Sequence, residues 1–360
     1  MTLHVGMIAD DLTGALDAAA PFAERGLRTR VVLAHADWDA AATADAEVLC
    51  INTASREIAA DEAAHRVTIA TTKLTAFKPT LLFKKVDSRL KGHLGLELGA
   101  MLRASGRTTI TLAPAIPDLG RFVIHGSVRG IGIDEPIDAN ALCGVLPVLV
   151  PDAQDNAAMD LIADSIAAAP DTILAAGARG LAMALARRFP IRGHAPAVHP
   201  LAQPLLICIG SRDVITKAQV DHLLHQVSPL HLSAPNGAVP DARPVPIALV
   251  TADQADDIES GIVVANRFAQ GLVRLVRQQR PASMLLCGGE TAFAVLTRLG
   301  VQTLDLGGEA LPGVPFANAL IDGRQVVILT KSGGFGSPDT ISLLVGMPAE
   351  LDCTLEESRL

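Results

Sequence analysis

Short apolar runs alternate with amphipathic, alanine-rich stretches along most of the chain. The first run, Val5 to Ala9, stops at Asp10 and Asp11 and is followed by a helical pattern that reaches Ala20. A short apolar run bounded by polar residues is typical of a buried strand, and the apolar repeat after it is typical of a helix. Because this order recurs, the sequence predicts an α/β fold of two domains, each with a mainly parallel sheet flanked by helices.

In the first half, strands are predicted where β-branched and leucine residues cluster, and helices where apolar residues recur every three to four positions. The predicted strands are 29–34, 47–52, 80–86, 108–113, 148–150 and 172–175, and the predicted helices are 59–75, 94–103, 156–168 and the stretch from the turn at 177–180 to residue 188. From 122 to 150 the periodicity is poor and glycine and proline recur, which indicates loop or short antiparallel structure.

The second half repeats this alternation. The predicted strands are 205–209, 230–233, 246–251, 284–287 and a run that begins at 326, and the predicted helices are 215–226, 256–280, 291–299 and a last one that begins near 339. Between the halves lie Pro190, Pro196, Pro200 and Pro204, which exclude one continuous helix. At 360 residues the chain exceeds the size of most single cores, so we expect domains at 1–200 and 201–360.

Composition and charge narrow the class of protein. The chain is 49% hydrophobic and 19% charged, with a mean hydropathy of +0.36, yet it has no apolar run of the roughly 20 residues that span a membrane. Its net charge is −8 and its aromatic content is 3%, with no tyrosine. This composition predicts neither a membrane protein nor a nucleic-acid-binding protein, because nucleic-acid binding relies on basic side chains.

Five cysteines are odd in number and widely spaced, without a Cys-x-x-Cys pair: Cys50, Cys143, Cys208, Cys287 and Cys353. We therefore expect reduced, mostly buried thiols rather than disulfides or a zinc site. The amino-terminal residues lack the pattern of an export signal, so the expected location is the cytoplasm.

Two adjacent acids at the end of the first strand are the first candidate site residues. One of them, Asp10 or Asp11, accounts for a helix cap worth roughly 1 kcal/mol, but a cap needs only one acid. Ligands of parallel sheets bind at the carboxyl ends of the strands. We therefore interpret this position as the rim of an active site.

A second polar cluster follows the strand at 80–86. Seven of the ten residues from Lys84 to His93 are polar or charged, so we expect this stretch to lie outside the core. The polar set of the first half combines both signs of charge: Asp10, Asp11, Arg56, Lys85, Asp87, Ser88 and Arg89. An anionic, hydroxylated substrate needs both, since arginine holds carboxylates and aspartate orients or deprotonates a hydroxyl group. A solvated cluster of salt bridges explains the same spacing equally well.

Glycine-rich turns are the candidate chemistry of the second half. They lie at Gly210-Ser211-Arg212, at Gly288-Gly289-Glu290-Thr291 and at Lys331-Ser332-Gly333-Gly334. Such turns expose backbone N–H groups to an anion, although a single turn more often reflects tight packing. Neither the dinucleotide fingerprint nor the Walker-A pattern occurs. Three turns in one domain, with Lys331 as a point charge, nevertheless favour phosphate binding.

These stretches also carry a family resemblance. Five of them, 8–15, 84–92, 210–212, 288–292 and 331–336, resemble the signatures of the four-carbon acid sugar kinase family, in the family's order and over nearly the whole chain. The resemblance implies a substrate domain followed by a nucleotide domain, and ATP-dependent phosphorylation of acids such as threonate, erythronate or 3-oxo-tetronate.

By position, the resemblance also assigns contacts. The acid sugar would meet Asp10 or Asp11, Arg56 and the stretch Lys85-Val86-Asp87-Ser88, and ATP would meet Ser211, Gly288 to Thr291 and Gly334. The polar cluster after the strand at 80–86 adds Arg89 to the predicted substrate contacts. The third glycine turn adds Lys331 and Gly333 to the predicted nucleotide contacts.

The sequence therefore predicts a kinase that closes over ATP, Mg²⁺ and a small hydroxy or keto acid. Asp87 is the expected residue that orients or deprotonates the acceptor hydroxyl group, with Asp11 or Asp10 as the alternative. A non-catalytic sensor of organic acids and a sugar-acid dehydrogenase are the competing classes. The metal ligands are left open, and so is the oligomeric state, for which a homodimer is one expectation.

One segment departs from the family pattern. After Pro114 to Arg121, members of the family usually continue with a longer segment that contains aromatic residues, whereas 122–150 here is short and lacks tyrosine. We expect the preferred substrate to differ from linear threonate. A branched or oxidised acid resembling 3-oxo-isoapionate is the first expectation and 3-oxo-tetronate the second.

Overall fold

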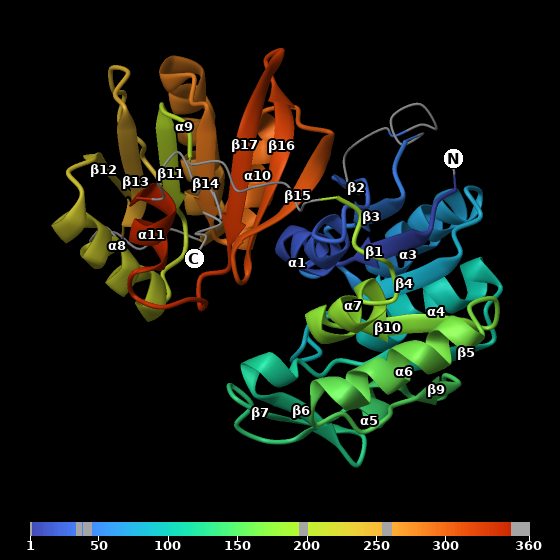
Figure 1. Ribbon diagram of the computed structural model, residues 1–360. Coiled ribbons are helices and arrows are strands. Elements are labelled where there is room, and N and C mark those ends of the chain that lie inside the picture. Colours follow the sequence, from blue (N-terminus) through green and yellow to red (C-terminus); the bar gives the residue numbers. More distant parts are fainter. Residues whose placement is uncertain (1, 34–37, 39–44, 194–200, 254–260, 347–360) are drawn as a thin grey trace, which may run out of the picture.

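The computed structural model describes residues 2–33, 38, 45–193, 201–253 and 261–346. Their main feature is a sheet of 14 strands in the order β12-β13-β11-β14-β17-β16-β15-β2-β3-β1-β4-β10-β5-β9. The first half of the chain forms one end of this sheet and the second half forms the other (Figure 1). The α/β class, with mainly parallel strands flanked by helices, is therefore confirmed.

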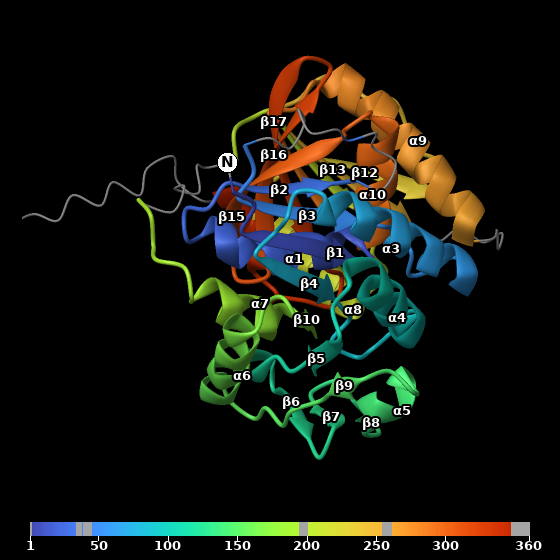
Figure 2. The same ribbon diagram turned by 90° about the vertical axis from the view of Figure 1, so that its right-hand side faces the viewer.

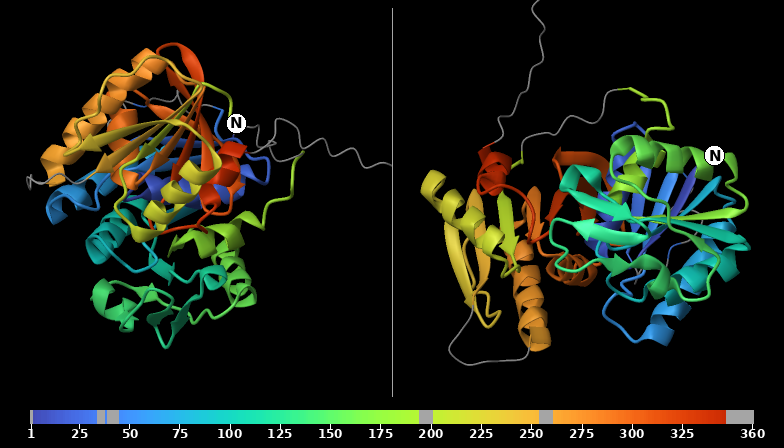
Figure 3. Two further views of the ribbon diagram at one scale, coloured as in Figure 1. Left: turned by 90° about the vertical axis from the view of Figure 1, so that its left-hand side faces the viewer. Right: turned by 90° about the horizontal axis from the view of Figure 1, so that it is seen from below.

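Within the large sheet, every neighbouring pair of strands from the first half is parallel. The strands are β1 (Val5–Ala9), β2 (Thr29–Val32), β3 (Val48–Asn52), β4 (Leu81–Lys85), β5 (Thr109–Ala113), β9 (Val148–Leu149) and β10 (Ile173–Gly177). The helices are α1 (Leu12–Ala23), α3 (Ala60–Thr75), α4 (Leu94–Ser105), α6 (Asn156–Ala168) and α7 (Arg179–Ala186). Helices α1, α6 and α7 cover one face and α3 and α4 the other (Figure 3).

The central strand β1 is wholly buried, which fixes the position of the acids that follow it. Helix α3 packs directly on it, because a Cβ atom on Gly6 would lie 2.8 Å from a methyl group of Leu74. A side chain at position 6 would push the helix away.

The segment with poor periodicity forms a small antiparallel sheet. It contains β6 (Arg121–Ile124), β7 (Ser127–Gly130) and β8 (Ile137–Asp138), preceded by the 3₁₀ turn η1 (Pro117–Leu119) and followed by α5 (Ala139–Cys143). Loop or short antiparallel structure was predicted for this segment, and antiparallel strands are what the structure shows.

The second half contains a five-stranded parallel part. Its strands are β11 (Leu205–Ile209), β12 (Leu230–Pro235), β13 (Ile247–Asp253), β14 (Ser283–Cys287) and β17 (Arg324–Lys331), and its helices are α8 (Val214–Gln226), α9 (Gly261–Gln279), α10 (Gly289–Arg298) and α11 (Thr340–Gly346). Helices α9 and α10 lie on one face of these strands (Figure 2), and α8 and α11 lie on the other (Figure 3).

A hairpin that the sequence analysis missed joins the halves. Strands β15 (Thr303–Leu311) and β16 (Val314–Ile321) are antiparallel to each other, β16 is antiparallel to β17, and β15 is antiparallel to β2. The sheets of the two halves are thus hydrogen-bonded edge to edge. The proposed division at residue 200 stays a prediction, because 194–200, with Pro196 and Pro200, lie outside the described residues.

Two further expectations concern single features. Cys50, Cys143, Cys208 and Cys287 are free and buried, as predicted, whereas Cys353 lies outside the described residues. Burial raises the pKa of the Cys50 thiol to about 12 and that of the Cys143 thiol to about 11, so neither is a reactive thiolate at neutral pH. Among the described helices, none is both long and apolar enough to cross a membrane.

Candidate active site

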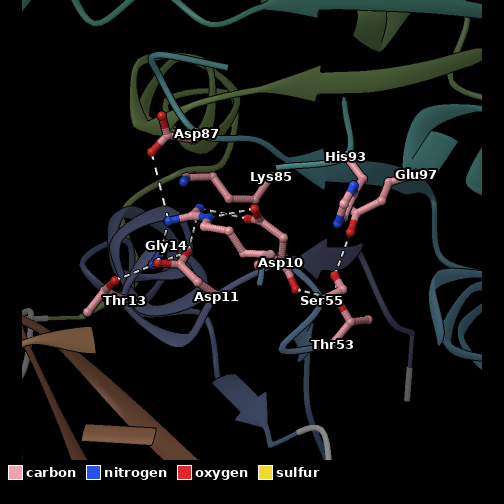
Figure 4. A network of polar contacts seen from close by, with 12 residues as sticks. Asp10, Asp11, Thr13, Gly14, Thr53, Ser55, Lys85, Asp87, His93 and Glu97 are labelled. Carbon is pink, nitrogen blue, oxygen red and sulfur yellow. Dashed lines mark hydrogen bonds and ion pairs between the residues drawn. The ribbon is translucent and has the colours of Figure 1, made fainter. Parts of the chain in front are cut away.

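The acids at the end of β1 are held by one arginine. The guanidinium group of Arg56 donates two hydrogen bonds to the carboxylate of Asp10, at 2.7 and 2.9 Å, and two to that of Asp11, at 2.9 and 3.0 Å (Figure 4). Bidentate pairs of this kind fix orientation as well as charge. The structure thus brings together Asp10 and Asp11, which follow β1, and Arg56, which follows β3.

The two acids differ in their other contacts. Asp11 caps α1, since its side chain accepts hydrogen bonds from the Gly14 backbone N–H and the Thr13 hydroxyl group. Asp10 is 3% exposed; its burial raises its pKa, but the charges of Lys84 and Arg56 and the Arg56 hydrogen bonds outweigh burial and lower it. The Asp10 carboxylate is therefore ionised at neutral pH, and both carboxylates accept hydrogen bonds from Arg56.

Lys84 occupies the core, which corrects the expectation that the whole stretch 84–93 lies outside it. Its side chain is 1% exposed, and its ammonium group lies 2.8 Å from Glu97 of α4. Glu97 also accepts a hydrogen bond from the hydroxyl group of Ser55, which in turn contacts Thr53 (Figure 4). The buried charge is tolerated because it is paired and hydrogen-bonded.

Lys85 faces the other side of β4. It is 5% exposed and lines a cavity, and among the described residues no hydrogen bond or ion pair joins its ammonium group to a partner. The absence of a Cβ atom on Gly14 leaves room for this group, since a Cβ there would lie 2.7 Å from it. An unpartnered buried cation at the start of a helix is suited to a bound anion.

The loop after β4 presents a carboxylate and a hydroxyl group. Val86 anchors the loop through its backbone N–H, which donates to the carbonyl oxygen of Gly177. One oxygen of Asp87 accepts the Arg89 N–H at 2.8 Å, and the other lies 3.9 Å from Arg56. Ser88 is buried and accepts a 2.6 Å hydrogen bond from Arg121.

These side chains surround a cavity of about 200 Å³ that both halves line. The first half contributes Asp11, Thr13, Gly14, Asp17, Arg56, Lys85, Asp87, Ser88, Ile116, Leu119, Arg121, Ala178 and Arg179, and the second half contributes Gly313, Pro315, Thr330, Ser332 and Phe335. The volume is below the 300–1,000 Å³ typical of pockets for drug-sized ligands, so this cavity fits a small, charged molecule.

A half-buried ion cluster at the wall of this cavity joins the halves. Arg179 of α7 lies 3.1 Å from Asp17 of α1 and 2.7 Å from Glu309 of β15. Burial raises the pKa of both carboxyl groups, and the charge of Arg179 only partly offsets this effect. The cluster therefore fixes β15 against α1 at this cavity.

A second cavity, of about 800 Å³, lies in the second half. It is lined by Gly210, Ser211, Arg212, Ala252, Val264, Ala265, Asn266, Phe268, Gly288, Gly289, Glu290 and Thr291. Its size falls within the range of cofactor pockets. Gly288 has a φ of 105°, which L side chains rarely adopt, and it precedes the first turn of α10.

Residues that line the two cavities contact each other at the starts of two helices. A Cβ atom on Gly289, at the start of α10, would lie 3.0 Å from the hydroxyl oxygen of Thr13, at the start of α1. Helix N-termini carry free N–H groups and a partial positive charge. A group transferred between the cavities would pass this junction.

Lys331 lies beneath the third glycine turn and lines neither cavity. Its ammonium group donates to the carbonyl oxygens of Ser332 and Gly333, at 2.9 and 3.4 Å. Burial lowers its pKa, partly offset by Cys287 and Asp213. Gly333 and Gly334 pack against Ser211 and Asp213, so the observed contacts of Lys331 shape the turn.

The sequence analysis missed several residues that line the first cavity. Arg121 follows the strand at 109–113 by eight residues, and Arg179 follows the strand at 173–177 by two. Their positions shortly after strand ends could have identified them as candidates from the sequence. Within the described ranges, no three His, Cys, Asp or Glu side chains are grouped to hold a metal ion.

Two family models match this chain. Residues 5–132 match the model of a sugar-binding N-terminal domain, and residues 206–341 match that of a nucleotide-binding C-terminal domain. A D-threonate kinase of Salmonella typhimurium is 29% identical over 93% of this chain and 96% of its own length. A 3-oxo-tetronate kinase of Pseudomonas fluorescens is 26% identical, with 96% and 97% covered.

Solved structures share the fold. A Salmonella typhimurium LT2 protein superposes with a TM-score of 0.75 at 22% identity, covering 94% of this chain and 98% of its own. A Haemophilus influenzae protein superposes with a TM-score of 0.71 at 20% identity, covering 95% and 99%.

Proposed function

We propose that this chain, which belongs to the four-carbon acid sugar kinase family, transfers the γ-phosphoryl group of ATP to a hydroxyl group of a small sugar acid. The observation that carries the proposal is the contact between Thr13, which lines the first cavity, and Gly289, which lines the second. Relatives named as kinases favour this function over the sensor and the dehydrogenase.

Phosphoryl transfer depends on positioning and on neutralisation of charge more than on covalent chemistry. Asp87 has a carboxylate oxygen without a hydrogen-bond donor among the described residues, and we assign to it the orientation or deprotonation of the acceptor hydroxyl group. Lys85 offers its ammonium group to the transferred phosphoryl group. Arg56 holds Asp10 and Asp11 in place.

The larger cavity suits ATP, because the backbone at the start of α10 can receive phosphate oxygens. Mg²⁺ supplies charge neutralisation in such reactions, and proteins hold it through one or two carboxylates together with the phosphates.

The decisive experiment is an ADP-release assay with ATP, Mg²⁺ and a panel of D-threonate, D-erythronate, 3-oxo-tetronate and a branched 3-oxo acid. We expect at least one acid to raise ADP release well above the rate without acid. If ATP binds but no acid raises the rate, the proposed function is wrong.

The same panel tests substrate choice. The Salmonella typhimurium alignment covers 417 positions, more than the 360 residues of this chain, so that relative has segments that are absent here. We expect the branched or oxidised acids to give the highest kcat/KM, since altered contacts to substrate hydroxyl groups change discrimination strongly. A tenfold preference for D-threonate or D-erythronate would disprove this expectation.

We place this reaction in the cytoplasm, a proposal supported by the buried, free state of the four described cysteines. A homodimer stays a prediction.

The nucleotide assignment predicts a selective effect of Gly288→Ala. This change forces a side chain onto a backbone with a φ of 105°, so the turn should shift and the KM for ATP should rise roughly tenfold or more. Gly300→Ala is the matched control, because Gly300 follows the other end of α10 at a φ of 73° with nothing within 4 Å of its Cβ position. Equal KM values for ATP in both variants would contradict the assignment.

A further inference from the structure

The cations of the substrate cavity fall into two groups. Arg56 is neutralised by Asp10 and Asp11, and Arg179 is neutralised by Asp17 and Glu309. Among the described residues, no carboxylate forms an ion pair with Lys85 or with Arg121. The cavity therefore offers two cationic positions to a ligand, one at the start of α1 and one at the small sheet.

Arg121 is held in place by neutral groups alone. It begins β6, and its guanidinium group donates to the hydroxyl oxygen of Ser88 at 2.6 Å and to the carbonyl oxygen of Ile131 at 3.0 Å. The backbone pairing of Ile116 with Arg121 fixes the strand beside the cavity. Its charge and its remaining N–H groups are thus available, while its orientation is already set.

A second guanidinium group lies close to the first. A Cβ atom on Gly132 would lie 2.7 Å from the side chain of Arg89 and 3.5 Å from that of Arg121. Burial and the charge of Arg89 lower the pKa of Arg121, and Asp87 only partly offsets them. Two neighbouring cations repel each other, and a bound anion would remove this repulsion.

We propose that Arg121, with Arg89 at the rim, binds the carboxylate group of the sugar acid. The inference rests on the proposed kinase function and adds the orientation of the substrate. With its carboxylate at Arg121, a short acid extends past Ser88 toward Asp87 and Lys85, and its acceptor hydroxyl group faces the junction at Thr13. Arginine suits this role because its planar fork matches a carboxylate in two parallel hydrogen bonds.

The position of Arg121 also explains how the small sheet affects specificity. The sheet β6-β7-β8 lies at the end of the first half away from β12 and β13 (Figure 1). Of its residues, Arg121 is the one that lines the cavity within the described part of the chain. A change in the length of 122–150 would therefore act on the substrate by moving this guanidinium group.

The test compares Arg121→Met with Arg129→Met, a matched loss of charge on an exposed residue of β7 that does not line the cavity. Substrates are the best acid of the panel and threitol, a neutral four-carbon polyol. We expect Arg121→Met to raise the KM for the acid about 10- to 150-fold, to leave the KM for ATP within about twofold, and to reduce the preference for the acid over threitol by the same factor. Arg129→Met should behave as the unaltered chain, and Arg121→Lys should fall between.

Calorimetric titration with sodium D-threonate, without nucleotide, separates this inference from the proposed function. Unchanged acid affinity and preference in Arg121→Met would overturn the inference while turnover by the unaltered chain still supports the kinase. Binding that Arg121→Met loses, without ADP release from any acid, would support the carboxylate site and overturn the kinase. Absence of both binding and turnover in the unaltered chain would overturn both. If Arg121→Met does not fold, Arg121→Lys decides by the same criteria.

Discussion

Replacing Asp87 by asparagine should lower kcat by 10²-fold or more, with the KM for ATP changed by no more than about twofold. Asp87 is the one acid after β1 and β4 that keeps an oxygen without a donor among the described residues: that oxygen lies 3.9 Å from Arg56, beyond hydrogen-bond range. An amide at this position keeps the shape of the side chain and the bond to the Arg89 N–H but accepts no proton from a substrate hydroxyl group.

Asp11→Asn is the matched comparison for Asp87→Asn. Both oxygens of Asp11 already accept hydrogen bonds, from Gly14 and Thr13 and from Arg56. An asparagine still caps α1, so this variant should lose mainly ion-pair energy and retain more turnover than Asp87→Asn. Steady-state kinetics with the best acid of the panel decides. If Asp87→Asn turns over nearly normally and Asp11→Asn does not, the catalytic role belongs to Asp11.

The grouping of polar residues in the first half could be predicted from the sequence, because the position of each residue relative to the end of its own strand is visible in the sequence. Asp10, Arg56 and Lys85 each stand at or just after the carboxyl end of a strand, and parallel strands place these ends at one edge. Once β1, β3 and β4 are recognised, their juxtaposition follows from the topology. The structure adds the pairing: Arg56 joins both acids, which explains why two adjacent carboxylates follow β1.

The hairpin β15-β16 was missed because β15 depends on pairing with residues that are distant in the sequence. Strand β15 contains Gly307 and Gly308, which weaken an isolated strand, and the pairing with β16 shifts register around them. Its other partner is β2, about 270 residues earlier, where Thr29 pairs with Leu306. A pairing over this distance leaves no repeat in the sequence, so neither the junction of the halves nor the contact of Glu309 with Arg179 could be derived from it.

Lys84 and Lys85 are a second case in which the sequence does not reveal which distant residues a side chain contacts. They are adjacent and both buried, and the alternation of a strand sends them to opposite faces. The sequence does not reveal that only Lys84 forms an ion pair with a carboxylate of the described residues, because Glu97 comes from a helix that begins nine residues after Lys85. The difference in partners predicts opposite consequences for the same substitution.

Lys84→Met should destabilise the protein by roughly 3–5 kcal/mol, because it leaves the buried carboxylate of Glu97 without its cation. Lys85→Met breaks no ion pair and should change the free energy of unfolding by no more than about 1 kcal/mol, yet it should lower kcat 10²- to 10³-fold by removing the charge offered to the phosphoryl group. Urea unfolding and steady-state kinetics measure the two quantities on each variant.

The control for the structural half is the double variant Lys84→Met with Glu97→Gln, which removes both charges and should recover part of the lost stability. After correction for the fraction of folded protein, the kcat of Lys84→Met should exceed that of Lys85→Met by at least tenfold. Retained kcat with lost stability in Lys85→Met would contradict this prediction. The ammonium group of Lys85 would then stabilise the fold through the surrounding acids. The anion bound on this side of the cavity would be held instead by the helix N-termini at Thr13 and Gly289.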